Sequence, residues 1–287
     1  MVDAIQTALE LVQSIITDRS NRNERSRRVA AFVGWQFWKR FIRRPHIVKL
    51  FNGYRFMAYP NDDIASSIIY YRIPDYAEIS FLRQHINNGT LIDVGANVGS
   101  FTLLLADRIQ HAILFEPNPL AAERARQNIA LNHLEFQVIA QALSDTEGEI
   151  TFEDRGGTSS LNRTVTETVK TTFPVRRVNR TTLDAFLAQC SFPAPISLVK
   201  IDVEGHENAV IRGMQNCLKA WRPLVMFEYL QRTNLDETQT LFQAAEYIIA
   251  EMVDGYLRMA EQPVRPLQNL FAIPTECRGN FDWGRNS

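Results

Sequence analysis

The chain has 287 residues, of which 45% are hydrophobic and 22% are charged, a composition typical of a soluble globular protein with a large core. It contains no run of about 18 apolar residues, which excludes a membrane-spanning helix, and its N-terminus lacks the basic start and apolar stretch of a secretory signal. The wide spacing of Cys190, Cys217 and Cys277 argues against a zinc motif or a disulfide framework. We therefore expect a cytoplasmic protein.

Residues 1–75 are predicted to form a helical extension that is basic and aromatic. Between Arg19 and Arg44 the chain has nine Lys or Arg residues and one acid, Glu24, although the net charge of the whole chain is only -1. Aromatic side chains follow at three-residue steps that are compatible with one face of a helix: Phe32, Trp35, Trp38 and Phe41. This face could pack on the core or on a second copy in a homo-oligomer. It could instead contact an anionic membrane surface or a lipid-linked substrate.

Residues 76–287 are predicted to form an α/β domain. From about residue 90, short apolar runs that end in acids or turn residues alternate with helical stretches, as in a parallel sheet with crossover helices. The expected strands are "TLIDVG", "AILFEP", "EFQVIA", "SLVKIDV" and "PLVMFEY". Two final strands, "EYIIAEMVDGYLRMA" and "QNLFAIP", would close the sheet edge. A segment around 149–180, rich in Thr and Arg, is predicted to form a β-hairpin beside the site.

The stretch "LIDVGANVGSFTLLLA" joins an expected strand to a helix through a glycine turn. In open α/β sheets, such a turn lets a ligand approach the backbone at the carboxyl end of a strand. The turn positions are Asp93, Gly95, Asn97 and Gly99. Glu116 ends the next strand, where an acid can bind ribose hydroxyls. Because "GANVG" lacks the middle glycine of a dinucleotide site, S-adenosyl-L-methionine fits better than NAD.

A second group of polar residues follows the strand "SLVKIDV". Asp202, Glu204, His206 and Glu207 fall within six positions. If the strand continued, alternation would place Lys200, Asp202 and Glu204 on one side. Glu204 and Glu207 are also explained as acids that cap the start of the following helix.

The motifs "LIDVGANVGSFTLLLA", "LFEPNP", "ALSDTEGEITF", "TTLDAF", "LVKIDVEGHENAVIRGM" and "PLVMFEY" together resemble the FkbM family of S-adenosylmethionine-dependent methyltransferases, from about residue 75 to 273. "DVGANVG" and "KIDVEGHE" are the most specific of them. The resemblance implies a class I methyltransferase fold. This is a Rossmann-like, mostly parallel sheet of seven strands with helices on both faces and an antiparallel last strand. It also implies O-methylation of a hydroxyl on a sugar, glycolipid or natural product.

The resemblance further implies roles for individual residues. The methionine end of the cofactor would meet Asp93, Gly95, Asn97 and Gly99. Glu116 would bind the ribose, and Ala142 and Leu143 would contact the adenine. Tyr76 and Glu78 would approach the cofactor from the preceding helix.

Methyl transfer to an alcohol requires alignment of the acceptor oxygen and removal of its proton by a base, or activation by a metal. Asp202, Glu204 and His206 are expected to meet the acceptor hydroxyl. His206 has the ordinary pKa best suited to a base near neutrality, whereas Asp202 could act as the base or bind a divalent metal ion.

Three other functions are less consistent with the sequence. An NAD-dependent oxidoreductase is disfavoured by the missing glycine and by the lack of a Tyr-x-x-x-Lys pair. A non-catalytic, membrane-associated binding protein would not need the strand-end acids. A nucleic-acid methyltransferase could use the basic segment, but the Asn/Asp-Pro-Pro-aromatic signature of base methylation is absent.

Overall fold

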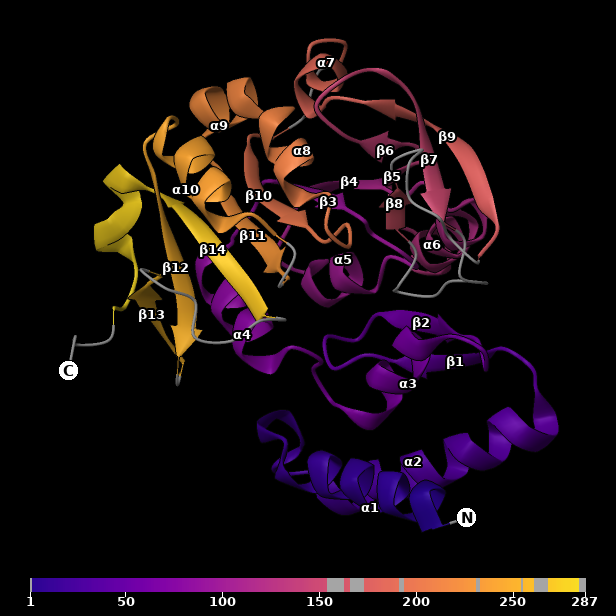
Figure 1. The fold of residues 1–287 in the computed structure, drawn as a ribbon. Helices are drawn as coiled ribbons and strands as arrows, with labels where there is room; N and C mark the ends of the chain where they lie inside the picture. The colour runs from indigo at the N-terminus through magenta and orange to yellow at the C-terminus, as the bar shows by residue number, and fades with distance from the viewer. Residues whose placement is uncertain are drawn as a thin grey trace.

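The computed structural model describes residues 2–153, 163–165, 173–190, 194–230, 233–253, 255–260 and 268–283. At its centre is an eight-stranded sheet with the order β13-β12-β14-β11-β10-β3-β4-β5 (Figure 1). The strands are β3 (Thr90–Val94), β4 (His111–Phe115), β5 (Gln137–Ile139), β10 (Ile196–Ile201), β11 (Leu224–Tyr229), β12 (Tyr247–Val253), β13 (Tyr256–Met259) and β14 (Gln268–Pro274). The strands from β11 to β5 are parallel, and β14 lies antiparallel between β11 and β12. This is the mostly parallel α/β sheet that the sequence predicts.

The sheet has one strand more than the seven expected. The sequence predicts one strand in "EYIIAEMVDGYLRMA", whereas the structure has two, β12 and β13, which pair antiparallel with Val253 opposite Tyr256. Asp-Gly at positions 254 and 255 is a dipeptide that favours two-residue hairpins, and Gly255 has a φ of 89°. β13 is therefore an outer strand added to the expected arrangement.

Helices cover both faces of the sheet. They are α4 (Tyr76–His85), α5 (Ser100–Leu105), α6 (Pro119–Leu131), α7 (Leu183–Leu187), α8 (Glu207–Arg212), α9 (Gln215–Trp221) and α10 (Leu235–Gln243), and the 3-10 helix η3 (Thr275–Asn280) follows β14. Leu91 of β3 packs in one apolar cluster with residues of α4, α5 and α6, whereas its neighbour Ile92 packs in another with residues of α7 to α10. Successive side chains of a strand point to opposite faces, so β3 is buried on both.

A smaller sheet lies beside the carboxyl ends of the central strands. It has the order β6-β9-β7-β8, and its strands are β6 (Ala142–Leu143), β7 (Gly148–Glu153), β8 (Arg163–Val165) and β9 (Val175–Thr181). β7 and β9 pair antiparallel from Gly148 opposite Arg180 to Glu153 opposite Val175. β7, β8 and β9 correspond to the predicted excursion around 149–180, part of which lies outside the described residues.

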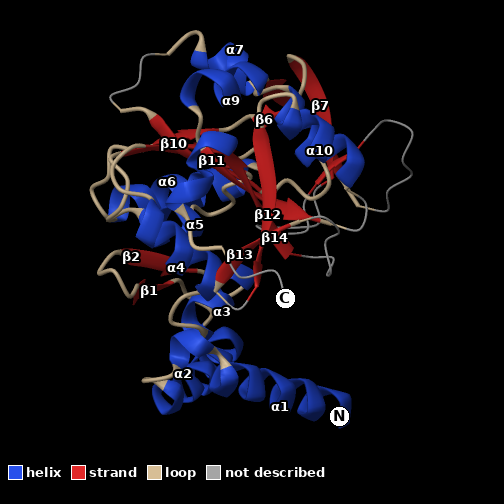
Figure 2. Ribbon diagram, turned by 90° about the vertical axis from the view of Figure 1, so that its left-hand side faces the viewer, coloured by secondary structure: helices blue, strands red, loops and turns tan. Residues whose placement is uncertain are grey.

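The N-terminal module, residues 2–70, lies below the sheet in Figures 1 and 2. Its elements are α1 (Val2–Thr17), η1 (Arg19–Asn21), α2 (Arg25–Phe37), the π-helix η2 (Trp38–Ile42), β1 (His46–Lys49), β2 (Arg55–Ala58) and α3 (Asp63–Tyr70). The hairpin of β1 and β2 corrects the purely helical prediction, and Asn-Gly at 52 and 53 was its sequence signal. Phe32 and Trp35 belong to the same apolar cluster as Leu91, so the module packs on the sheet domain.

The aromatic residues of α2 and η2 do not share one face. Phe32 and Trp35 are buried, and the Trp35 indole N–H donates to Ser66 Oγ at 3.1 Å, whereas Phe41 is 65% exposed. A step of three residues turns an α-helix by about 300°, which is about 60° short of a full turn. After the three steps from Phe32 to Phe41, this shortfall has moved Phe41 to a different side of the helix from Phe32. No helix of the described chain is long and apolar enough to cross a membrane.

Candidate functional site

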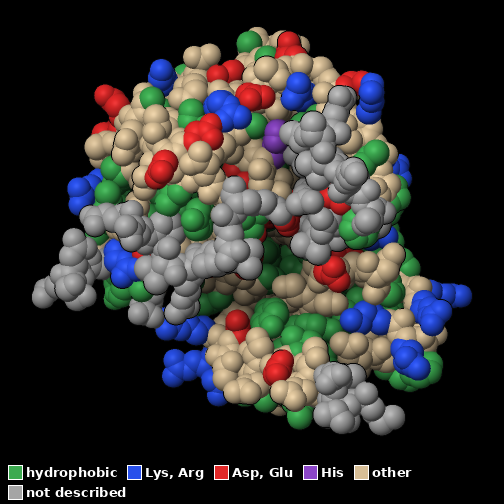
Figure 3. Space-filling view, viewed as in Figure 1, with side chains coloured by type: hydrophobic (Ala, Val, Ile, Leu, Met, Phe, Trp, Pro, Cys, Tyr) green, Lys and Arg blue, Asp and Glu red, His purple; other side chains and the backbone are tan. Residues whose placement is uncertain are grey.

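A cavity of about 330 Å³ lies at the carboxyl ends of β3, β4, β10 and β11. Figure 3 shows the molecule hollowed between the sheet domain and the N-terminal module, with hydrophobic and acidic side chains in the hollow. The predicted site residues that line the cavity are Gly95, Asn97, Glu116, Ala142, Leu143, Asp202, Glu204 and His206. Ile64, Ser67 and Ile68 of α3 add a wall from the N-terminal module. The fold thus brings four separate predicted segments to one cavity.

The loop after β3 depends on glycine. Gly95 has a φ of 74°, and a Cβ at this position would lie 1.8 Å from the backbone oxygen of Asp202. Gly99, with a φ of 77°, precedes α5, and Asn97 adopts a φ of 49°, which Asn tolerates better than most residues. The motifs "DVGANVG" and "KIDVEGHE" therefore meet in space at Gly95.

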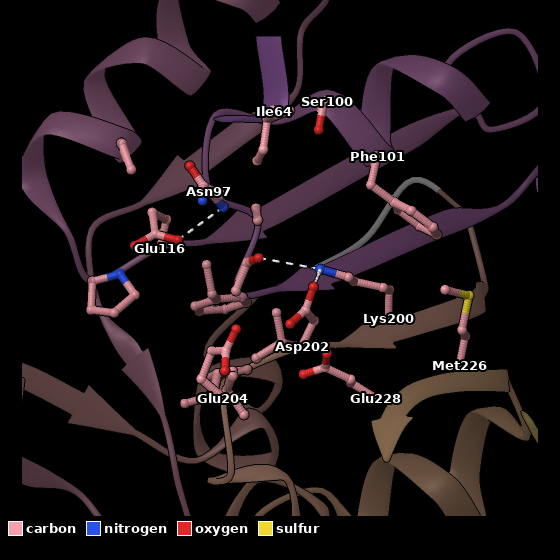
Figure 4. Close-up of a pocket in the computed structure, with 18 of the residues that line it drawn as sticks. Ile64, Asn97, Ser100, Phe101, Glu116, Lys200, Asp202, Glu204, Met226 and Glu228 are labelled. Atoms are coloured by element: carbon pink, nitrogen blue, oxygen red, sulfur yellow. Dashed lines mark hydrogen bonds and ion pairs between the residues drawn. The ribbon is translucent and has the colours of Figure 1, made fainter. Parts of the chain in front are cut away.

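Glu116 is held in place at the end of β4. Its side chain is buried, and one oxygen accepts the backbone N–H of Asn97 at 2.8 Å (Figure 4). The other oxygen accepts the backbone N–H of Asn118, also at 2.8 Å. Burial raises the pKa of Glu116 to about 7, against the effect of these hydrogen bonds. Each carboxylate oxygen can accept a second hydrogen bond, so the group fits the two hydroxyls of a ribose.

Lys200 of β10 connects the two sides of the cavity. Its ammonium lies 3.0 Å from Asp202 Oδ2 and 3.8 Å from Asp93 Oδ1, and it donates to the Gly95 oxygen at 3.3 Å (Figure 4). Burial opposes the charge of Lys200, but Asp202 and Asp93 outweigh it and raise the pKa of the ammonium. Asp93 is fully buried and accepts the Thr102 hydroxyl at 2.7 Å, so it supports Lys200 from behind the cavity wall.

Three carboxylates gather on the side away from Glu116. One carboxylate oxygen from each of Asp202, Glu204 and Glu228 lies within 4.8 Å of the other two (Figure 4). Burial raises the pKa of Glu228 to about 8, and the negative charges of Asp202 and Glu204 act in the same direction. In the described part of the chain, Glu228 Oε2 is buried without a hydrogen-bond partner. Carboxylate oxygens at this spacing could also hold a divalent cation.

Sequence reasoning did not select Lys200 or Glu228 as functional residues. The signal for Lys200 was a lysine inside the apolar strand "SLVKIDV", and that for Glu228 was an acid at the end of "PLVMFEY". Glu228 follows Phe227, which pairs with Ile201, so it lies level with Asp202 at the carboxyl ends of β10 and β11. The rule that ligands bind at the carboxyl ends of parallel strands would have found it.

His206 lines the cavity, and its Nε2 lies 2.9 Å from Ser144 Oγ. Burial lowers the pKa of His206 to about 4, and the charges of Arg180 and Arg212 act in the same direction. The imidazole is therefore neutral at pH 7. A weakly basic imidazole is a poor acceptor for an alcohol proton.

Tyr76 and Glu78 lie in the first turn of α4. The described cavity wall nearest to them is formed by Pro74 and Asp75, just before the helix. Tyr76 is 38% exposed, and burial raises the pKa of Glu78. Their contact with a cofactor stays a prediction.

Residues 93–256 match the model of the methyltransferase FkbM domain. The chain belongs to the FkbM methyltransferase family. Hexuronic acid methyltransferase AglP of Haloferax volcanii is 29% identical over 143 residues, 48% of this chain and 55% of that protein. The chain thus spans about half the length of this curated relative. Family membership implies S-adenosylmethionine as the cofactor.

Two solved structures are also similar. The FkbM methyltransferase of Methylobacillus flagellatus KT has 12% identity and a TM-score of 0.42, covering 86% of this chain and 59% of that one. The Pyrococcus abyssi tRNA (uracil-54, C5)-methyltransferase, in complex with S-adenosyl-L-homocysteine, has 13% identity and a TM-score of 0.44, covering 79% and 43%.

Proposed function

We propose that the protein transfers the methyl group of S-adenosylmethionine to a hydroxyl oxygen of a sugar, glycolipid or other glycan acceptor. The observation that carries this proposal is the position of Glu228 beside Asp202 and Glu204, in the same cavity as Glu116. The name of the relative AglP supports a sugar acceptor.

On the cofactor side, Glu116 binds the ribose hydroxyls, and Gly95, Asn97 and Gly99 shape the loop that receives the methionine end. Ala142 and Leu143 of β6 provide the apolar contact for the adenine. S-adenosylmethionine, when bound, supplies a methyl carbon that is open to attack by an oxygen. The preformed bonds of Glu116 to Asn97 and Asn118 leave little to reorganise on binding.

On the acceptor side, Glu228 takes the hydroxyl proton. The acceptor oxygen bonds to the methyl carbon as the carbon–sulfur bond breaks, and its proton passes to the carboxylate of Glu228. Asp202 is held by Lys200 and is therefore placed to orient the hydroxyl. Glu204 and the neutral His206 are proposed as further contacts of the acceptor.

The charge of the cavity bears on the choice of acceptor. Its described lining has the carboxylates Asp75, Glu116, Asp202, Glu204 and Glu228, and one ammonium, that of Lys200. Because the pKa values of Glu116 and Glu228 are about 7 and 8, these two groups gain their full negative charge only above pH 8. The negative charge of the cavity then repels an anionic sugar unless a divalent cation joins the site. We therefore expect a neutral sugar to react without metal, and a hexuronic acid only when a cation occupies Asp202, Glu204 and Glu228.

Calorimetry with S-adenosylhomocysteine tests the cofactor side. We expect a dissociation constant in the micromolar range, and Glu116→Gln should weaken binding about 10- to 100-fold, because hydrogen bonds to a charged group are lost. Glu123→Gln, an exposed position on α6, is the matched control and should bind normally. Tight NAD binding without binding of S-adenosylhomocysteine would contradict the proposal.

Labelled methyl transfer to neutral hexoses and to hexuronic acids, with Mg²⁺ or with a chelator, tests the acceptor side. Methylation of a neutral sugar that survives the chelator supports Glu228 as the base. Activity that the chelator abolishes would assign Asp202, Glu204 and Glu228 to a metal instead. Label that appears on nitrogen or carbon would overturn O-methylation.

A further inference from the structure

The N-terminal module has an exposed basic–aromatic corner where α2 passes into the π-helix η2. Its members are Val33, Phe37, Arg40, Phe41, Ile42, Arg43 and Arg44. Phe37 and Phe41 are 57% and 65% exposed, and their ring centroids lie 4.7 Å apart. Two phenyl rings that pack on each other in solvent form an apolar patch of the kind that marks an interaction surface.

The charge of this corner is entirely positive. Residues 33–44 include no acid, and in the described chain Arg40, Arg43 and Arg44 are exposed and form no ion pair. Figure 3 shows basic side chains gathered at the end of the module where α2 leads to β1. The corner therefore matches a partner that is both apolar and anionic.

The conformation of the corner is fixed by its own contacts. The Arg43 N–H donates to the Trp38 oxygen at 3.0 Å, which closes the π-turn, and Arg43 has a left-handed φ of 54°. The Trp38 indole N–H donates to the Arg44 oxygen at 2.7 Å, and its ring packs on His46. The rings of Phe37 and Phe41 are thus presented outward by an ordered turn, with little ordering left to occur on binding.

We propose that the basic–aromatic corner docks on an anionic lipid bilayer. Phe37 and Phe41 enter the interface between headgroups and acyl chains, while Arg40, Arg43 and Arg44 contact lipid phosphates. A second copy of the chain is a poorer partner, because a two-fold contact through this corner would bring the arginines of both copies together without an acid between them.

Co-sedimentation of the full chain with vesicles tests this proposal. Binding should rise with the phosphatidylglycerol content of phosphatidylcholine vesicles and fall with added salt. The triple variant Arg40→Gln/Arg43→Gln/Arg44→Gln and the double variant Phe37→Ser/Phe41→Ser should each weaken binding at least about tenfold. Binding of the double variant should keep its salt dependence.

Two control variants remove the same kinds of side chain, arginines and apolar residues, elsewhere on the N-terminal module. Arg22→Gln/Arg25→Gln/Arg27→Gln loses the same charge, and Leu9→Ser/Ile16→Ser loses exposed apolar side chains of α1. Thermal melts confirm that each variant is folded. The proposal fails if the wild-type chain does not bind, or if the controls weaken binding as much as the corner variants. It also fails if sedimentation velocity shows that Phe37→Ser/Phe41→Ser dissociates a dimer while vesicle binding is unchanged.

Discussion

The two sides of the cavity differ in how their carboxylates are satisfied. On the cofactor side, both oxygens of Glu116 accept backbone N–H groups from adjoining loops. On the acceptor side, Asp202, Glu204 and Glu228 face one another, and in the described chain Glu228 Oε2 has no hydrogen-bond partner. Buried polar groups without partners are costly. The cofactor side is therefore organised in advance, whereas the acceptor side needs a proton, a hydroxyl or a cation from its ligand.

The two sides are joined at one point. A Cβ on Gly95 would meet the Asp202 oxygen, and Lys200 bonds to both Gly95 and Asp202. The cofactor loop and the acidic cluster are therefore positioned relative to each other by backbone contact and a single buried ammonium. A change at this junction should disturb both sides, whereas a change within one side should disturb that side alone.

The largest effect is expected at the junction. Gly95→Ala places a methyl group 1.8 Å from the Asp202 oxygen, so the loop must move, and both S-adenosylhomocysteine binding and turnover should fall below detection. Gly99→Ala is the matched control, because it has a similar φ but its nearest neighbour is Leu114 Cδ2 at 3.2 Å. It should keep measurable binding and turnover. Calorimetry and a methyl-transfer assay on both folded variants make the comparison, and equal losses would refute the special role of the junction.

Within the acceptor side, Glu228→Gln should lower turnover about 10² to 10⁴-fold, the usual effect of removing a general base. Affinity for S-adenosylhomocysteine should change little. In the wild-type enzyme, kcat/KM should rise with pH toward about 8 as Glu228 loses its proton, and this rise should disappear in the variant. His206→Ala should cost far less, because the pKa of His206 is already about 4. A larger loss in His206→Ala than in Glu228→Gln would return the role of base to the histidine.

The two sides also differ in how far the sequence predicts them. The cofactor loop is local, since Asp93 to Gly99 span seven positions and Glu116 ends the next strand, so spacing alone indicates a nucleoside site. The acceptor side is assembled from β10 and β11. Alternation along β10 already places Lys200 on the side of Asp202. Glu228 belongs to β11, and only the strand pairing shows that its side chain lies beside Asp202. Sequence alone could not assign the pKa of His206, because its lowering arises from burial in the fold.

The fold shows the same contrast between local and long-range information. All five parallel strands of the central sheet were predicted, because each combines an apolar run with a following turn. The β1–β2 hairpin and β13 were missed, although Asn-Gly and Asp-Gly signals were present. The helix expected over "ENAVIRGMQNCLKA" is divided into α8 and α9, and the π-turn of η2 was not expected. The two hairpins were therefore readable from local turn signals, whereas the division of the helix and the π-turn depend on how a segment packs against neighbours that are distant in sequence.

The smallest expected effect is a pH dependence of stability in the protein without ligand. The pKa of Glu116 rises on folding from 4.5 to about 7, and that of Glu228 from 4.5 to about 8, so between pH 4.5 and these values the folded state binds more protons than the unfolded state. Their contribution to stability is complete below pH 4.5 and is lost as pH rises through 7 and 8. The lowered pKa of His206 acts in the opposite direction, but only between about pH 4 and 6.5.

Between pH 7 and 8, the free energy of unfolding from urea titrations should therefore fall by at most about 1 kcal/mol, because Glu228 is partly exposed and solvent screens its charge. Glu228→Gln should remove most of this fall in the free energy of unfolding. Glu116→Gln should mainly reduce the fall below pH 7, because the pKa of Glu116 is about 7. A free energy of unfolding that rises from pH 7 to 8 in the wild-type protein, or a fall that both variants retain, would mean that the acceptor side is already satisfied before any ligand binds.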